Sequence, residues 1–129
     1  MHGEASSVQE WNRFWTMADD VVQSHHIVID RPAGSSHPRY PAVIYPLDYG
    51  YLDGTAALDG DGVDCWIGSV TERKLTGVIV TVDTYKSDTE LKWLIGCTPA
   101  EMSAALSTHR TAHQAAVLIL RDGLMAGSG

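Results

Sequence analysis

The stretch from Asp59 to Asp64 constrains this chain more than any other, because it places three aspartates and two glycines within six residues. Glycines let the backbone bend tightly around a ligand. Three carboxylates this close together repel one another unless a positive charge lies between them. Hard cations such as Mg²⁺ take one or two carboxylates, keep several waters and leave room for phosphate oxygens. The run therefore predicts a turn that holds a metal in a phosphate-handling site.

An acidic turn exposed to solvent is the alternative, because aspartate and glycine are ordinary turn residues. An EF-hand calcium loop requires acids at positions one, three and five and a glutamate at position twelve. Counted from Asp59, positions five and twelve hold Val63 and Val70. The calcium loop is therefore excluded, and the solvated turn stays open.

Length and charge narrow the class of the protein. With 129 residues, of which 44% are hydrophobic, the chain can bury a modest core and form one domain, residues 1–129, without disulfides. The net charge of −7 argues against nucleic acid as a partner, because phosphate backbones are bound by basic surfaces. An acidic protein that handles phosphates needs metal ions to offset its own charge.

The cysteines and the apolar runs indicate a cytoplasmic protein. Cys65 and Cys97 stand alone, with no CxxC partner. The sequence shows no apolar amino-terminal run typical of a signal peptide and no run long enough to span a bilayer. We therefore expect two buried thiols, no membrane partner and a cytoplasmic location.

Residues 1–25 and 26–97 differ in their apolar pattern. In the first part, helical spacing predicts an amphipathic helix over residues 6–23, with Ser6 or Ser7 as its cap. The second part contains short apolar runs separated by turn residues, which is typical of a small barrel. The predicted strands are His26–Asp30, Ala42–Tyr45, Val63–Gly68, Leu75–Val82 and Leu91–Gly96.

Residues 98–121 begin with a strong helix signal. Thr98 is a capping residue, a proline follows at the first helical position, and Glu101 lies three residues after the cap, so we predict a helix to about residue 108. Residues 116–120 are apolar throughout and predict a strand, with a buried helical turn as the alternative. An Asp-Gly turn opens the tail, residues 122–129, whose last five residues we expect to be disordered.

Several segments carry a resemblance to a known family. Their order and spacing resemble the soluble family I inorganic pyrophosphatases over residues 27 to about 95, as a shortened and divergent member. The resemblance implies a mainly β fold with flanking helices (α+β), built on an OB-like five-stranded β-barrel with the acidic site in its mouth. The segments are Ile27–Pro32 (IVIDRP), Arg39-Tyr40, Tyr45–Tyr51 (YPLDYGY), Leu58–Asp64 (LDGDGVD) and the pair Asp83 and Asp88.

The resemblance also implies roles for individual residues. Asp61 matches the base that accepts a proton from the attacking water, while Tyr49 and Arg39 match groups that contact the metal site or the substrate oxygens. The implied cofactor is Mg²⁺, with Mn²⁺ as an alternative, which activates the water and neutralises the departing phosphate. The implied metal ligands are Asp59, Asp64, Asp83 and Asp88, and the outer-shell or substrate-binding residues are Asp30, Tyr51 and Lys86.

Some positions depart from the family pattern. Gly62 stands where the family signature has proline or glutamate, and residues 40–45 are too few to form the hairpin that carries the family's substrate-binding arginine. Glu90 replaces a family lysine near the phosphates, and the tail has no match to the family's Tyr-Lys pair. The metal side of the expected site is thus nearly complete, while its cationic side is reduced. The candidates for replacement charge are Lys86, which lies between Asp83 and Asp88, Lys92 and Arg110.

The leading hypothesis is an enzyme that hydrolyses inorganic pyrophosphate to two phosphates with Mg²⁺. The lost cations are expected to weaken or alter this activity. Trp11, Trp15 and the apolar run 116–120 favour a homo-oligomer. Two alternatives stay open: a larger substrate that contains a pyrophosphate group, such as a nucleotide, and a non-catalytic metal-binding or assembly protein on the same barrel.

Overall fold

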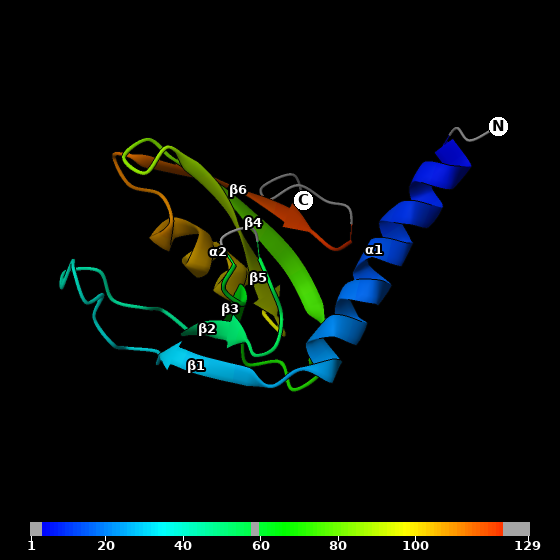
Figure 1. Ribbon diagram of the computed structural model, residues 1–129, viewed down its shortest axis with the longest axis horizontal. Helices are drawn as coiled ribbons and strands as arrows, with labels where there is room; N and C mark the ends of the chain where they lie inside the picture. The colour runs from blue at the N-terminus through cyan, green and yellow to red at the C-terminus, as the bar shows by residue number, and fades with distance from the viewer. Residues whose placement is uncertain (1–3, 58–59, 123–129) are drawn as a thin grey trace.

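The computed structural model describes residues 4–57 and 60–122 of the chain. This part contains two helices and six strands, with the long helix α1 lying along one side of the sheet (Figure 1). In chain order the elements are α1 (Glu4–Ser24), β1 (Ile27–Arg31), β2 (Asp48–Leu52), β3 (Val63–Ile67), β4 (Leu75–Asp83), β5 (Asp88–Ile95), α2 (Pro99–Thr108) and β6 (Gln114–Leu120).

The strands form one sheet in the order β1-β2-β3-β5-β4-β6. Neighbouring strands are antiparallel except β3 and β5, which are parallel. The mainly β fold with flanking helices is confirmed. However, the described sheet has six strands rather than five, and it is open, because no ladder joins its edge strands β1 and β6.

Helix α1 packs on one face of the sheet through an apolar stripe. Trp15, Ala18 and Val22 follow one another at three- or four-residue spacing and are buried against the strands. Asp19 lies on the same stripe, where its carboxylate accepts hydrogen bonds from the backbone N–H of Leu75 (3.0 Å) and from the guanidinium of Arg121 (2.8 Å). The helix predicted over residues 6–23 is confirmed, but the predicted cap is wrong, because the helix begins at Glu4 and Ser6 and Ser7 lie inside it.

Helix α2 covers the other face of the sheet. The side chain of Thr98 accepts a hydrogen bond from the N–H of Glu101, and the Glu101 carboxylate accepts one from the N–H of Thr98. Met102 and Leu106 of this helix pack in the core beside Trp66 of β3. The predicted capping box and helix are therefore confirmed.

The strand predicted over residues 42–45 is wrong. The segment between β1 and β2 is a loop, crossed by a single bridge between Ser36 and Ile44. Pro41 and Pro46 flank the predicted strand and cannot donate to a ladder. Tyr45 is buried all the same, so its apolar character reflects core packing rather than strand pairing.

Strand β2 has no counterpart among the predicted strands, because Gly50 at its centre is a poor strand former. The structure explains the glycine. A β-carbon at Gly50 would lie 1.7 Å from the carbonyl oxygen of Val28 on β1. The close approach of two strands therefore requires a residue without a side chain at this position.

The carboxyl-terminal apolar run forms the edge strand β6 rather than a helical turn. Both cysteines are buried, as predicted. Burial raises the pKa of the Cys65 thiol and of the Cys97 thiol to about 12. The predicted disordered tail lies outside the described residues.

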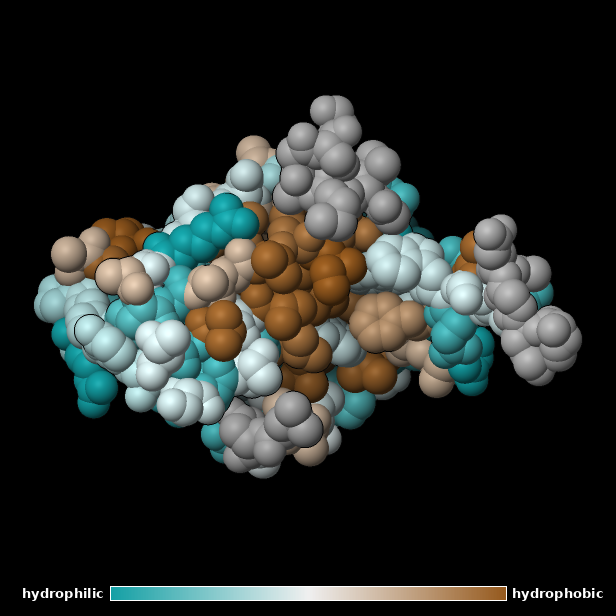
Figure 2. All heavy atoms as spheres, turned by 90° about the horizontal axis from the view of Figure 1, so that it is seen from above, coloured by the Kyte–Doolittle hydropathy of each residue, from teal (hydrophilic) through white to brown (hydrophobic). Residues whose placement is uncertain are grey.

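Large apolar side chains remain exposed beside α1. A groove between α1 and the sheet is lined by Trp11, Phe14, Val80, Leu91 and Ile119, among others. Figure 2 shows an apolar area across the middle of the molecule in the view from above. A second subunit would bury surface of this kind, and the homo-oligomer stays a prediction.

Candidate functional site

One face of the sheet, on the side covered by α2, carries a row of charged side chains. Side chains alternate along a strand, so Asp88, Glu90 and Lys92 of β5 project from the same face. The parallel register of β3 and β5 places Asp64 beside Lys92, and Asp83 ends β4 opposite Asp88. These five residues are called the polar row below.

Lys92 is the centre of the polar row. Its ammonium lies 2.9 Å from Asp64 Oδ2 and 2.6 Å from Glu90 Oε1, and its side chain is only 9% exposed. The ring of Tyr49 lies 5.7 Å from the same nitrogen. Burial alone would lower the pKa of Lys92, but its interactions with Tyr49, Glu90 and Asp64 outweigh burial and raise it. Lys92 is therefore a charged, internal cation held between two carboxylates.

Asp83 is held by protein donors at the turn between β4 and β5. Its Oδ1 accepts hydrogen bonds from the backbone N–H groups of Tyr85 (2.8 Å) and Lys86 (3.0 Å), and its Oδ2 accepts one from the side-chain amide of Gln114 (3.1 Å). The bond from the Lys86 N–H, helped by Gln114 and Tyr85, lowers the pKa of Asp83. Asp83 is thus ionised, and both of its oxygens are engaged.

Asp88 has the opposite environment. Burial raises the pKa of Asp88, and the carboxylates of Glu90 and Asp83 raise it further, against a smaller opposing effect of Lys86. Glu90 is the next residue along β5 that projects from the same face as Asp88. Two carboxyl groups this close need a proton or a cation between them. Asp88 is therefore the member of the polar row that would gain most from a bound cation.

A chain of hydrogen bonds connects the core to Asp83. Trp66 Nε1–H donates to His109 Nε2 (3.0 Å), and His109 Nδ1 lies 3.2 Å from the Oε1 of Gln114, whose amide donates to Asp83. Because Nε2 accepts, Nδ1 carries the proton and donates to Gln114. Burial, helped by the charge of Lys92, lowers the pKa of His109 to about 4, so the ring is neutral.

Sequence reasoning missed the role of His109 and Gln114 in this network. The two residues lie at the end of α2 and the start of β6, and neither belongs to a motif of the resemblance. The only local signal is that Gln114 is a polar residue directly before an apolar run.

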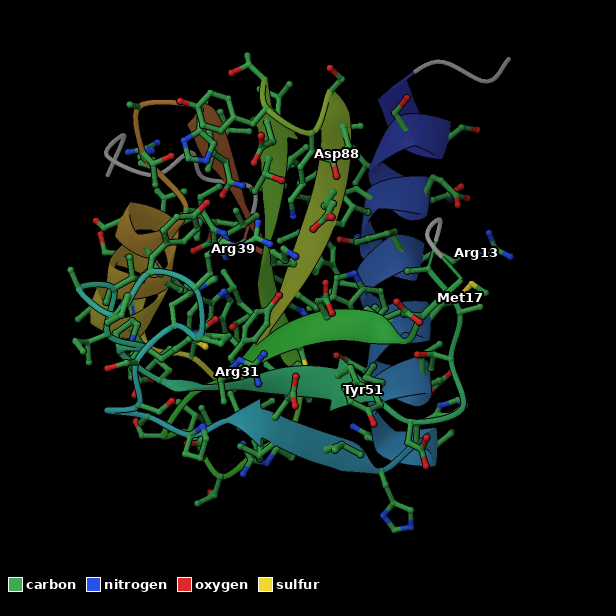
Figure 3. The ribbon with its side chains drawn as sticks, turned by 60° about the vertical axis from the view of Figure 1, so that its left-hand side comes forward. Arg13, Met17, Arg31, Arg39, Tyr51 and Asp88 are labelled. Atoms are coloured by element: carbon green, nitrogen blue, oxygen red, sulfur yellow. The ribbon has the colours of Figure 1, made fainter. Side chains whose placement is uncertain are left out.

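The loop between β1 and β2 brings cations to the site. Burial lowers the pKa of His37 in this loop, and the charges of Arg31, Arg39 and Lys86 lower it further. These three cations therefore lie near one ring, although they come from different segments. Figure 3 shows Arg31 and Arg39 on the side of the molecule away from α1.

Lys86 connects these cations with the polar row. It lies in the turn between β4 and β5, where its charge opposes the rise in the pKa of Asp88 and lowers the pKa of Glu90. The same charge acts on His37. Lys86 thus acts electrostatically both on the loop between β1 and β2 and on the polar row.

The two tyrosines of the resemblance lie on β2 beside the polar row. Tyr51 pairs with Asp64 across β2 and β3, and Tyr49 pairs with Trp66. Burial raises the pKa of Tyr49 above its ordinary value, so the phenol is neutral and able to donate a hydrogen bond.

The other predicted residues lie at the border of the site or beyond the described part. Asp30 is exposed on β1, where its carboxylate pairs with Arg31 at 3.5 Å. Asp61 lies in the loop before β3, where its carbonyl accepts a hydrogen bond from the N–H of Ala57 (2.7 Å). Asp59 lies outside the described residues.

The donor set fits a hard cation in its chemistry, although the ligands are not gathered in advance. Over residues 4–57 and 60–122, no three His, Cys, Asp or Glu side chains form a group that could hold a metal ion. Mg²⁺ needs only one or two protein carboxylates when waters and phosphate oxygens complete its shell. The adjacent carboxyl groups of Asp88 and Glu90 supply such a pair, and Lys92 separates them from Asp64.

Comparison with solved structures defines the class of the fold. The structure of an inorganic pyrophosphatase from Coxiella burnetii matches with a TM-score of 0.58 over 79% of this chain and 87% of that chain, at 13% sequence identity. The inorganic pyrophosphatase from Thermus thermophilus matches with a TM-score of 0.53 over 74% of this chain and 82% of that chain, at 17% identity. The chain therefore has the fold of inorganic pyrophosphatases.

Comparison of sequences confirms the resemblance to the same proteins. The chain is 35% identical over 63 residues to the inorganic pyrophosphatase of Mycoplasma pneumoniae, which is 43% of this chain and 34% of that protein. It is 28% identical over 96 residues to the inorganic pyrophosphatase of Yersinia pestis, which is 56% of this chain and 55% of that protein. The chain thus spans about a third to a half of the length of these relatives. No family model matches it.

In the part of the chain that the structure describes, neither helix is long and apolar enough to cross a membrane.

Proposed function

We propose that this chain hydrolyses inorganic pyrophosphate to two phosphates in a reaction that depends on Mg²⁺, with Mn²⁺ as an alternative. One observation carries the proposal: the polar row brings the ammonium of Lys92 within 2.9 Å of Asp64 and 2.6 Å of Glu90, so that one face of the sheet presents charges of both signs. A metal pyrophosphate complex presents both positive and negative charge, so its site needs groups of both signs. The similarity to inorganic pyrophosphatases in sequence and fold supports the same activity.

Individual residues have separate proposed roles in the reaction. Bound Mg²⁺ supplies the charge that activates the attacking water and neutralises the departing phosphate. Asp61 accepts the proton of that water. The guanidinium of Arg39 donates two hydrogen bonds to phosphate oxygens, and the neutral phenol of Tyr49 donates a hydrogen bond at the site. The proposed metal ligands are Asp59, Asp64, Asp83 and Asp88, and the proposed outer-shell or substrate-binding residues are Asp30, Tyr51 and Lys86.

Release of phosphate from inorganic pyrophosphate tests the proposal. We expect turnover with Mg²⁺ or Mn²⁺ and none with a chelator, and we expect Asp61→Asn to lower the rate by about 100-fold or more. Asp53→Asn is the matched control, because Asp53 is an exposed aspartate in the turn after β2. Equal rates for Asp61→Asn and the unmodified protein would contradict the proposed base.

A larger substrate with a pyrophosphate group, such as a nucleotide, is the second candidate. Tyr40 is 47% exposed next to Arg39, and its ring lies 5.1 Å from that of His37, so an aromatic surface for a base adjoins the cations. Under this candidate, nucleotides compete with pyrophosphate for cleavage. Metal binding without turnover of either substrate would instead favour the non-catalytic alternative.

A further inference from the structure

Lys92 differs from an ordinary surface lysine in its surroundings. Its side chain is 9% exposed and touches two carboxylates at hydrogen-bond distance. By contrast, the side chain of Lys74 is 44% exposed and its ammonium lies 3.7 Å from Glu72. A buried ammonium is costly unless it is paired, so the position of Lys92 is fixed by its partners.

The place of Lys92 in the sheet separates Asp64 from Asp88, two of the proposed metal ligands, and Glu90 adds a further carboxylate beside Asp88. Asp64 lies on one side of the ammonium, and Glu90 with its neighbour Asp88 lies on the other. The ammonium therefore fills the position from which a single cation would contact both groups. With Lys92 present, Asp64 and Glu90 together carry one uncompensated negative charge instead of two.

We infer that Lys92 is a built-in cation that competes with divalent metal for Asp64 and Glu90. This inference rests on the proposed function, because it concerns the carboxylates of the same site. Two positive charges a few ångströms apart repel each other, so a metal reaches Asp64 and Glu90 together only when the ammonium leaves them. The departing ammonium has a suitable partner in a phosphate oxygen, since charge-assisted bonds to phosphate are strong. Metal therefore binds weakly to the free protein and more tightly together with a phosphate ligand.

Mn²⁺ binding to the whole chain tests the competition without measuring activity. The concentration of free Mn²⁺ is followed by electron paramagnetic resonance during titration of the unmodified protein, Lys92→Met and Lys74→Met. Lys92→Met removes the competing charge at nearly constant volume, and we expect its Kd for Mn²⁺ to fall by roughly tenfold or more. Lys74→Met changes the net charge equally but lies away from the polar row, so its Kd should match that of the unmodified protein. An unchanged or raised Kd in Lys92→Met overturns the inference.

A second measurement uses the unmodified protein, because Lys92→Met leaves two carboxylates unpaired and could fail to fold. Side-chain ¹⁵N spectra report lysine ammonium groups held in ion pairs, and Lys92→Arg assigns the signal of Lys92. The inference predicts that this signal shifts or disappears as Mg²⁺ and inorganic phosphate are added. A signal that stays in place at saturating Mg²⁺ and phosphate overturns it.

The two proposals fail separately. If the unmodified protein releases phosphate in a metal-dependent way but Lys92→Met binds Mn²⁺ no more tightly, only the competition is refuted. Tighter Mn²⁺ binding by Lys92→Met, in a chain that cleaves no pyrophosphate, refutes only the proposed function.

Discussion

Acidification should destabilise this protein through His109. In the folded state its Nε2 accepts a hydrogen bond from Trp66, and its Nδ1 donates to Gln114. A second proton would have to sit on Nε2, where it would face the indole N–H. Burial and the charge of Lys92 hold the pKa of His109 at about 4, below its ordinary value of 6.5. Protonation of this ring therefore favours the unfolded chain.

The sign and size of the effect follow from these two pKa values. Because the folded pKa lies below the unfolded one, the contribution of His109 is fully present above pH 6.5 and is lost as the pH falls toward about 4. The free energy of unfolding should accordingly drop by about 2 kcal/mol between neutral pH and about pH 5. Asp83 does not add to this loss, because its pKa is lowered and it is still ionised at about pH 5.

Urea denaturation followed by tryptophan fluorescence measures the free energy of unfolding at both pH values. His109→Gln keeps an acceptor for Trp66 but cannot titrate, so the unmodified protein should lose about 2 kcal/mol more on acidification than this variant does. His26→Gln is the matched control, because His26 is exposed in the connection between α1 and β1. Equal losses in the unmodified protein and in His109→Gln would refute the reasoning.

Two further substitutions test the packing of the sheet, with urea denaturation as the measurement in each case. Gly50→Ala should lower the free energy of unfolding by more than about 3 kcal/mol, because the new methyl group would lie 1.7 Å from the carbonyl oxygen of Val28. Gly34→Ala is the control: its methyl group would meet nothing within 4 Å, so it should cost only about 1 kcal/mol for its positive φ. Similar costs at the two positions would count against the close approach of the strands. Asp19→Ala should lower the free energy of unfolding by about 2 kcal/mol, because it leaves the buried N–H of Leu75 without its acceptor. Asp19→Asn should cost less, because it keeps an acceptor oxygen. Equal losses for both variants would show that the charge of Asp19, not its hydrogen bond, stabilises the helix.

Most elements of the fold could be predicted because their signals are local. The capping box at Thr98, the helical spacing around Trp15 and the β-branched run of β4 each lie within one segment of sequence. The two errors, a strand at residues 42–45 and the missed strand β2, have a common cause. In both places the decisive contact is with a distant strand. Tyr45 lies outside the sheet and packs its ring against Trp66 of β3, and Gly50 pairs because β1 approaches it.

The sequence points to candidate residues of the site but not to the contacts between them. The aspartates and tyrosines named from the resemblance come from the β2–β3 region and the β4–β5 turn, where motif and spacing are visible. Their partners come from far along the chain. Lys92 reaches Asp64 across 28 positions, and Gln114 reaches Asp83 across 31. Such pairs depend on sheet register, which a single sequence does not reveal.

Glu90 illustrates why a substitution judged along the sequence can be misjudged in the fold. The resemblance places a lysine at this position. A glutamate there replaces a side chain that attracts phosphate with one that repels it. On β5, however, positions 90 and 92 project from the same face, and Lys92 lies 2.6 Å from Glu90. The positive charge on this face is therefore moved toward Asp64 rather than lost. For the ammonium of Lys92 to bind phosphate, it must first leave its ion pairs with Asp64 and Glu90, so the strength of these two ion pairs limits how far this face can act as the cationic half of the site.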